Sequence, residues 1–204
     1  MEKSIVILGG SFNPPTKAHI ELLESAVKQL NAEFGLFVPS SHNYVTRKMS
    51  KVKEYSSVYS ESTRFKMLQE ICKKHSLLKV SKIEFGDDGK GHTYNTLCKL
   101  QSLYPNYKLI FVIGADKLKI IPKWHSSEDF FKQFDFAVTH RDDIDMNKFI
   151  STHPVLSKYK NIFHEVTIDN SMNEVSSTTA REYINTKNIE KLKEILDETT
   201  IKLL

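Results

Sequence analysis

The sequence holds little that would tie it to a metal, a membrane or a disulfide framework. Only two of its 204 residues are cysteines, Cys72 and Cys98, and each stands alone among helix-like residues, so we expect free thiols. No Cys-x-x-C motif and no clustered His/Cys pair indicates a zinc site. No apolar run approaches the ~20 residues that a membrane-spanning helix needs. We therefore expect no metal-ligating residues and no membrane partner.

The charge balance also lacks a strong sign. The net charge is +4, from 29 Lys and Arg against 25 Asp and Glu, which is too weak and too dispersed to predict nucleic-acid binding. A small anionic substrate fits this balance. The chain opens directly into an apolar run and not into a signal peptide, so we expect a soluble cytoplasmic protein. At 204 residues and 40% hydrophobic, it is long enough for a single packed domain, 1–204, in which residues 185–204 form a helical edge.

The stretch from residue 5 to residue 19 organises the rest of the chain. A short apolar strand, residues 5–8, is followed by Gly9 and Gly10, which allow a sharp turn and leave no side chain to keep a ligand away. A helical pattern begins at about Thr16. Strand, glycine turn and helix in this order direct backbone N–H groups at an anion, and Thr16 and His19 lie one turn apart on the same side. The alternative is a stiff loop followed by an ordinary helix cap.

Further apolar runs alternate with helical patterns along the chain. Strands are expected at residues 34–38, 77–83, 108–114, 136–139 and 161–168, and helices at residues 62–74, 94–103, 127–134, 176–185 and 189–196. Residues 40–62 are expected to form a loop, and residues 142–160 to contain at most one helix. This alternation predicts an α/β fold with a doubly wound parallel sheet. Its ligand site should lie beyond the carboxyl ends of the strands, at a switch point.

Two features follow the strand at residues 108–114. Gly114 is followed by Ala115 and Asp116, and a carboxylate in this position can accept hydrogen bonds from ribose hydroxyls or can cap the next helix. Trp124, the one tryptophan, lies in a proline-flanked loop. It could stack on a heterocycle or could cover the core, and the sequence supports both interpretations equally.

A second anion-binding pattern lies near the end of the chain, where Val175-Ser-Ser-Thr-Thr-Ala-Arg181 opens a helix. Ser176 or Ser177 is the expected N-cap, and Thr178 and Arg181 share one face near the positive end of that helix. Hydroxyls, N–H groups and a guanidinium in one place could bind a polyphosphate. The alternative is an ordinary capped helix with a solvent-exposed arginine.

These motifs together resemble a known family. Gly9-Gly-Ser-Phe-Asn-Pro-Pro-Thr-Lys-Ala-His19 is similar to the (H/T)-x-G-H signature of the nucleotidyltransferase superfamily, and Val175–Arg181 resembles its I-S-S-T-x-x-R motif. Phe111–Asp116 with Pro122–Trp124 resembles the middle of nicotinate (or nicotinamide) mononucleotide adenylyltransferases. Thr93-Tyr-Asn-Thr96 resembles a substrate-contacting segment of the same group. The resemblance spans nearly the whole chain, with the motifs in the right order.

The sequence departs from the family pattern in three places. Ala18 replaces the usual glycine, and its methyl group would lie close to the nucleotide. Thr16 stands where bacterial nicotinate enzymes usually have histidine. Residues 40–48 replace the usual Pro-Pro-His-Lys after the second strand, although Arg47 and Lys48 could still reach a phosphate.

The resemblance implies a Rossmann-like nucleotidyltransferase fold and a specific reaction. The 5′-phosphate of nicotinate mononucleotide attacks the α-phosphorus of ATP, pyrophosphate leaves, and deamido-NAD forms as a step of NAD biosynthesis. Mg²⁺ would be bound through the ATP phosphates, and a homo-oligomer is possible. The alternatives are nicotinamide mononucleotide as acceptor, another adenylyl- or cytidylyltransferase, and a nucleotide-binding module without catalysis. A dinucleotide-dependent dehydrogenase is less consistent, because G-x-G-x-x-G is missing.

The resemblance also assigns roles to individual residues. His19 donates a hydrogen bond to the α-phosphate, Thr16 bonds the same or an adjacent phosphate, and Arg181 holds the outer phosphates. The residues expected to bind ATP are Gly9, Gly10, Ser11, Phe12, His19, Gly114, Asp116, Ser177, Thr178 and Arg181. The residues expected to bind the acceptor are Asn13, Lys48, Thr93, Tyr94, Trp124 and Arg141.

Overall fold

The protein is built on one parallel β-sheet. The computed structural model describes residues 2–51, 58–87, 92–139, 145–172 and 175–204. The six strands lie in the order β3-β2-β1-β4-β5-β6, and every neighbouring pair is parallel. The strands are β1 (Ser4–Gly10), β2 (Phe34–Pro39), β3 (Leu78–Val80), β4 (Lys108–Gly114), β5 (Asp135–Thr139) and β6 (Phe163–Val166). The predicted doubly wound parallel α/β fold is confirmed.

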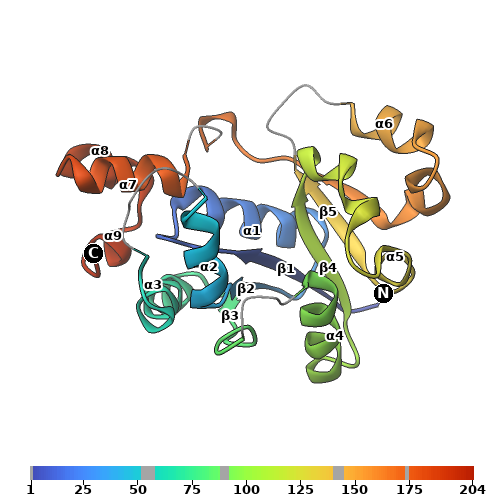
Figure 1. Cartoon of the computed structure of the whole chain (residues 1–204), viewed down its shortest axis with the longest axis horizontal. Helices are drawn as coiled ribbons and strands as arrows, with labels where there is room; N and C mark the ends of the chain where they lie inside the picture. Colours follow the sequence, from blue (N-terminus) through green and yellow to red (C-terminus); the bar gives the residue numbers. More distant parts are fainter. Residues whose placement is uncertain (1, 52–57, 88–91, 140–144, 173–174) are drawn as a thin grey trace.

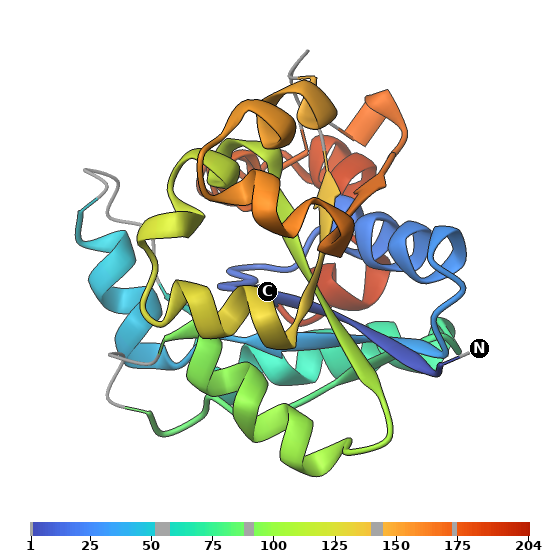
Figure 2. The ribbon, with the colours of Figure 1, turned by 90° about the vertical axis from the view of Figure 1, so that its right-hand side faces the viewer.

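Helices connect the strands (Figures 1 and 2). The α-helices are α1 (Lys17–Gln29), α2 (His42–Met49), α3 (Glu61–Lys74), α4 (Thr93–Leu103), α5 (Ser127–Gln133), α6 (Met146–Thr152), α7 (Ser177–Asn185), α8 (Ile189–Ile195) and α9 (Glu198–Ile201). Short 3₁₀ turns are η1 (Ala115–Lys119), η2 (Ile121–Lys123), η3 (Leu156–Ile162) and η4 (Asn170–Met172). Among the described residues, none of these helices combines the length and the apolar character needed to traverse a bilayer.

The central strand β1 shows why its sequence is continuously apolar. Ile5 and Ile7 belong to a core cluster shared with α4 and α5, whereas Val6 and Leu8 belong to a second cluster shared with α1 and α3. Successive side chains of a strand point to opposite faces, so a sheet covered on both faces needs apolar residues at every position. The two clusters fix the sheet between its helical layers and hold the carboxyl ends of β1 and β4 in place.

Two segments differ from the sequence prediction. Residues 40–62 were expected to form a loop but contain the helix α2. Its start is capped by Ser41, whose hydroxyl accepts the N–H of Tyr44 at 3.3 Å, and the four-residue spacing of buried Val45 and Met49 gives it one apolar side. Residues 142–160 were expected to hold at most one helix, yet α6 and most of η3 lie there, and η3 delays the start of β6 to Phe163.

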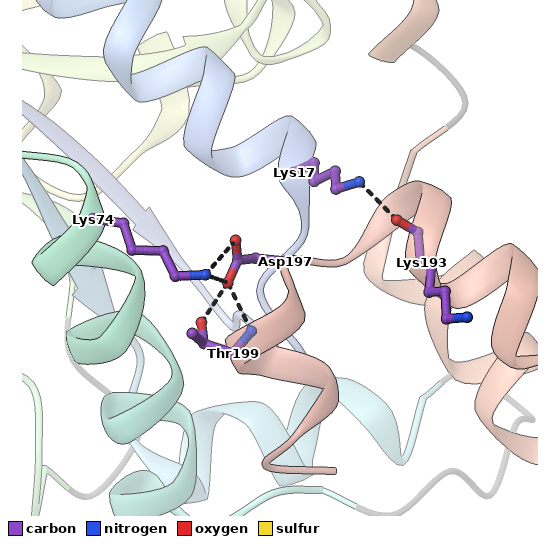
Figure 3. Close-up of polar contacts among 5 residues, drawn as sticks. All are labelled: Lys17, Lys74, Lys193, Asp197 and Thr199. Atoms are coloured by element: carbon purple, nitrogen blue, oxygen red, sulfur yellow. Dashed lines mark hydrogen bonds and ion pairs between the residues drawn. The ribbon is translucent and has the colours of Figure 1, made fainter.

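The C-terminal helices pack beside the start of α1. Figure 1 shows α7, α8 and α9 together at the end of the molecule opposite α5 and α6. In Figure 3, Lys17 Nζ of α1 donates to the carbonyl oxygen of Lys193 at 2.7 Å, and Lys74 Nζ of α3 lies 3.1 Å from Asp197 Oδ1. Asp197 in turn accepts the N–H of Thr199 at 2.8 Å and so caps α9.

The methyl group of Ala18 lies within this C-terminal packing. Ala18 is buried in a small apolar cluster with Ala180 of α7 and Ile195 of α8. It does not line the cleft described below. The methyl group therefore packs against the neighbouring helices, and its expected proximity to a nucleotide stays a prediction.

Candidate active site

A cleft of about 1010 Å³ opens at the carboxyl ends of β1 and β4. In the order β3-β2-β1-β4-β5-β6, connections from β1 run to one side and those from β4 to the other, so this is the switch point where α/β sheets bind ligands. Most residues that the sequence assigned to a site line it. These are Gly9, Gly10, Ser11, Phe12, Asn13, His19, Lys48, Thr93, Tyr94, Gly114, Asp116, Trp124, Ser177, Thr178 and Arg181.

Among the described residues, one assigned residue is not in this lining, because Thr16 is fully buried behind His19. Arg141 lies outside the described residues.

The glycine turn after β1 is shaped by an aromatic ring. A Cβ atom on Gly10 would lie 3.1 Å from the ring of Phe12, and Phe12 itself has a positive φ of 44°. The buried Phe12 ring contacts the His19 imidazole edge-on, with centroids 5.1 Å apart. Glycine at position 10 lets this ring fold back under the turn, where it supports His19.

The backbone of Thr16 fixes the orientation of His19. The Thr16 N–H donates to His19 Nδ1 at 3.1 Å, and the Thr16 hydroxyl lies 2.7 Å from the same nitrogen. A backbone N–H can only donate, so Nδ1 acts as the acceptor and the proton of the neutral ring is assigned to Nε2. From the sequence we expected Thr16 to bond to a phosphate. Its burial and its bond to Nδ1 instead make it the residue that orients His19.

The N-terminal ends of α1 and α7, referred to below as the two helix openings, are distant in the sequence and meet at this point. Ser177 Oγ at the start of α7 donates to the carbonyl oxygen of Pro14 at 2.8 Å, and Arg181 Nη1 donates to the carbonyl oxygen of Asn13 at 3.0 Å. Arg181 Nη2 also donates to the Thr178 hydroxyl at 3.0 Å. The N-cap is Ser176, whose hydroxyl accepts a backbone N–H of α7. Arg181 is buried and bonded, so the alternative of a solvent-exposed arginine does not hold.

Three cations from three different elements face the cleft. Lys48 lies on α2, Lys117 on η1 and Arg181 on α7. Partial removal from water, together with the charges of Lys117 and Arg181, lowers the pKa of the Lys48 ammonium. Such mutual repulsion between cations is relieved when an anion binds among them. Lys117 was not predicted, because a lysine in a short turn carries no distinguishing sequence signal.

Gly114 and Asp116 are geometrically linked at the end of β4. A Cβ atom on Gly114 would lie 2.5 Å from Asp116 Oδ1, so the carboxylate can fold back over the strand end only because residue 114 is glycine. Asp116 lies in the first turn of η1, where Gly114 occupies the N-cap, and its Oδ2 accepts from Lys117 Nζ at 2.7 Å. The carboxylate is thus presented at the cleft instead of capping a helix.

Aromatic rings gather where α4 and η2 border the cleft. Trp124 is half-buried and stacks on the core residue Phe130 with centroids 6.2 Å apart, so the interpretation that it covers the core is confirmed. It also lines the cleft, where stacking on a heterocycle stays a prediction. His92 and His125 were not predicted. Their rings stack at 4.4 Å and both line the cleft. Only the fold brings these two histidines, far apart in the sequence, into contact.

Glu84 is a further cleft residue that sequence reasoning missed. Burial raises the pKa of its carboxyl group, although the Thr96 hydroxyl donates to Glu84 Oε1 at 2.8 Å. Thr139, at the carboxyl end of β5, also lines the cleft and is buried. Neither residue belongs to a pattern that a single sequence reveals.

Comparison with known families agrees with this geometry. A family model described as cytidylyltransferase-like matches residues 7–183. This range includes both helix openings and every strand from β2 to β6, together with most of β1.

Individual relatives are similar over most of their length. A probable nicotinate-nucleotide adenylyltransferase of Listeria welshimeri is 35% identical over 141 residues, which cover 69% of this chain and 71% of the relative. A probable nicotinate-nucleotide adenylyltransferase of Lachnoclostridium phytofermentans is 30% identical over 183 residues, covering 89% and 87%. The solved structure of Plasmodium falciparum nicotinic acid mononucleotide adenylyltransferase complexed with NaAD has the same fold, with a TM-score of 0.71, 21% identity, and coverage of 98% of this chain and 94% of that one.

Proposed function

Since this chain belongs to the cytidylyltransferase-like family, we propose that it transfers the adenylyl group of ATP to nicotinate mononucleotide. The products would be deamido-NAD and pyrophosphate, a step of NAD biosynthesis. The observation that carries the proposal is the meeting of the two helix openings, where Ser177 and Arg181 of α7 bond to the carbonyl oxygens of Pro14 and Asn13. Two N-terminal helix ends directed at one cleft favour a polyphosphate ligand.

The proposed reaction is an in-line displacement at phosphorus. An oxygen of the acceptor's 5′-phosphate forms a bond to the α-phosphorus, and the bond from that phosphorus to the bridging oxygen breaks, so that pyrophosphate leaves with the electron pair. Such a transfer needs positioning and charge stabilisation and no covalent nucleophile. His19, with Nδ1 held by Thr16, would donate from Nε2–H to an α-phosphate oxygen as negative charge builds there.

The outer phosphates of ATP would lie at the start of α7. Ser177, Thr178 and Arg181 supply hydroxyls and a buried guanidinium there, and Lys48 and Lys117 add positive charge to the same cleft. Mg²⁺ would be bound through the phosphate oxygens, because the described residues contain no group of three His, Cys, Asp or Glu side chains able to hold a metal ion. When bound, the ion would neutralise charge on the phosphates.

The two nucleosides would lie on opposite sides of the glycine turn. The backbone from Gly9 to Phe12 would contact both, and Asp116 would accept from ribose hydroxyls of the adenosine. Trp124 would stack on the pyridine ring, near Thr93 and Tyr94 at the start of α4. Asn13 and Arg141 remain proposed acceptor contacts.

A substrate panel tests the proposal. The purified protein is incubated with Mg²⁺ and either ATP or CTP, each with nicotinate or nicotinamide mononucleotide, and both pyrophosphate and dinucleotide are measured. We expect turnover to be highest with ATP and nicotinate mononucleotide. A higher turnover with the amide would reassign the acceptor. No dinucleotide in any combination, despite measurable ATP binding, would indicate a nucleotide-binding module without catalysis.

A further inference from the structure

Arg64 is a cation enclosed between the turns that line the cleft. It lies on α3, its exposed fraction is 0%, and it heads the fully buried side chains when these are ranked by volume. Its guanidinium donates to three backbone carbonyl oxygens. Nη1 bonds to Ser11 at 2.8 Å, Nη2 to Ser40 at 2.6 Å and Nε to Tyr59 at 3.2 Å. One side chain therefore ties together three segments that are distant in the sequence.

Two of these segments line the cleft. Ser11 belongs to the glycine turn after β1, which leads into α1 with His19, and Ser40 follows β2 and leads into α2 with Lys48. The third segment is linked to the first a second time, because Asn13 Oδ1 accepts the Tyr59 N–H at 2.9 Å. The backbone already joins two of these turns, because the Ser40 N–H donates to the carbonyl oxygen of Gly10 at 2.9 Å. The Arg64 fork adds three further bonds that set how the glycine turn, the turn after β2 and the segment before α3 lie relative to one another.

The charge of Arg64 is balanced in an unusual way. Within the described residues, no carboxylate lies at ion-pair distance from its guanidinium, although Glu61 and Glu84 are near enough to favour its charged form. Burial lowers the pKa of Arg64, and carbonyl dipoles are its direct partners. An apolar side chain could fill the same space without the desolvation cost of a buried charge. The three hydrogen bonds to carbonyl oxygens offset that cost, and an apolar side chain could not make them.

We propose that Arg64 is a positioning residue for the adenylyl transfer, holding the glycine turn and the turn after β2 at the spacing that in-line attack requires. The inference rests on the proposed function. A guanidinium is planar and directs its donors in a fixed fork, so it sets distances between three acceptors at once. A lysine ammonium carries the same charge but has no fork, so it cannot hold all three carbonyl oxygens in the same geometry.

The test compares Arg64→Lys and Arg64→Gln with a matched control, Asp135→Asn. Asp135 is also a buried charged residue, but it lies at the start of β5 and bonds Lys108 and His164, away from the cleft. Thermal unfolding and steady-state kinetics are measured for all variants, the kinetics well below the lowest unfolding midpoint. We expect both Arg64 variants to lose kcat by roughly 10²-fold, with much smaller changes in both KM values. The Asp135 variant should lose stability while keeping kcat.

The outcomes separate positioning from structural support. An Arg64→Lys enzyme with the kcat of the control would overturn the proposal, since charge or mere filling of space would then suffice. If the Arg64 variants do not fold, NMR of the wild-type side chain decides. Separate Nη1 and Nη2 signals that persist when a non-hydrolysable ATP analogue binds would support a held fork, and a single averaged signal would overturn it. Wild-type protein without adenylyl transfer would instead refute the proposed function.

Discussion

Replacing His19 tests the proposed chemistry most directly, because the structure separates two roles of its ring. Nδ1 accepts the N–H of Thr16 at 3.1 Å and so completes the start of α1, while in the proposed reaction Nε2–H would donate to a phosphate. An asparagine oxygen can occupy the position of Nδ1, so His19→Asn should keep the helix start but remove the donor. His19→Ala removes both.

The expected magnitudes follow from these two roles. Losing one donor to the transition state costs about 10²–10³ in kcat, or roughly 2.7–4 kcal/mol. Losing a bond at a helix start costs about 0.5–2 kcal/mol of stability. Both variants should therefore lose the same 10²–10³ in kcat, whereas only His19→Ala should also unfold at lower urea concentration. The substrate KM values should change less than kcat, because the donor acts mainly on charge that develops in the transition state.

The assay is pyrophosphate release with saturating ATP and nicotinate mononucleotide, alongside urea unfolding followed by circular dichroism. His153→Ala is the matched control. His153 Nδ1 likewise accepts backbone N–H groups, from Val155 at 3.2 Å and Leu156 at 3.3 Å, and it does not line the cleft. The His153→Ala variant should lose stability and keep the wild-type kcat. Near-normal turnover by His19→Asn would refute the role of Nε2–H.

Four further predictions concern binding and stability. Trp124→Ala should remove about 1–3 kcal/mol of stacking free energy and raise KM for the mononucleotide by the corresponding factor, and an unchanged KM would remove Trp124 from the site. Nucleotide binding should take up protons at pH values between the lowered pKa of Lys48 and its ordinary value of 10.5, since an anion restores that pKa; calorimetry in buffers of different ionisation enthalpy measures the uptake, and Lys48→Met should reduce it. Burial alone would raise the pKa of Asp135, but its hydrogen bonds hold it below 3.8, so the carboxylate stabilises the fold above that pH and this contribution is lost as pH falls through the folded pKa; Asp135→Asn should reduce the pH dependence of the free energy of unfolding in urea below 3.8. Thr139→Val and Thr200→Val should each raise the unfolding midpoint, because both buried hydroxyls have no hydrogen-bond partner among the described residues; a lower midpoint would contradict this.

Local pattern was enough to predict the sheet. The run from Ile5 to Leu8 is apolar at every position, and only a strand covered on both faces needs that pattern. Helix α2 was not predicted, because its apolar side consists of only two residues, Val45 and Met49, in an otherwise polar segment. Periodicity over so short a span is too weak to distinguish a helix from a loop.

By itself, the sequence determined the strands, the order of the motifs, and the residue types expected to bind phosphate, because these depend on neighbours within a few positions. Which of those residues meet was decided by the tertiary structure. No local signal could show that Arg181 bonds to Asn13 or that Arg64 spans three turns. Contacts between residues far apart in the chain depend on how the strands are ordered in the sheet, and that order exists only once the whole core has packed.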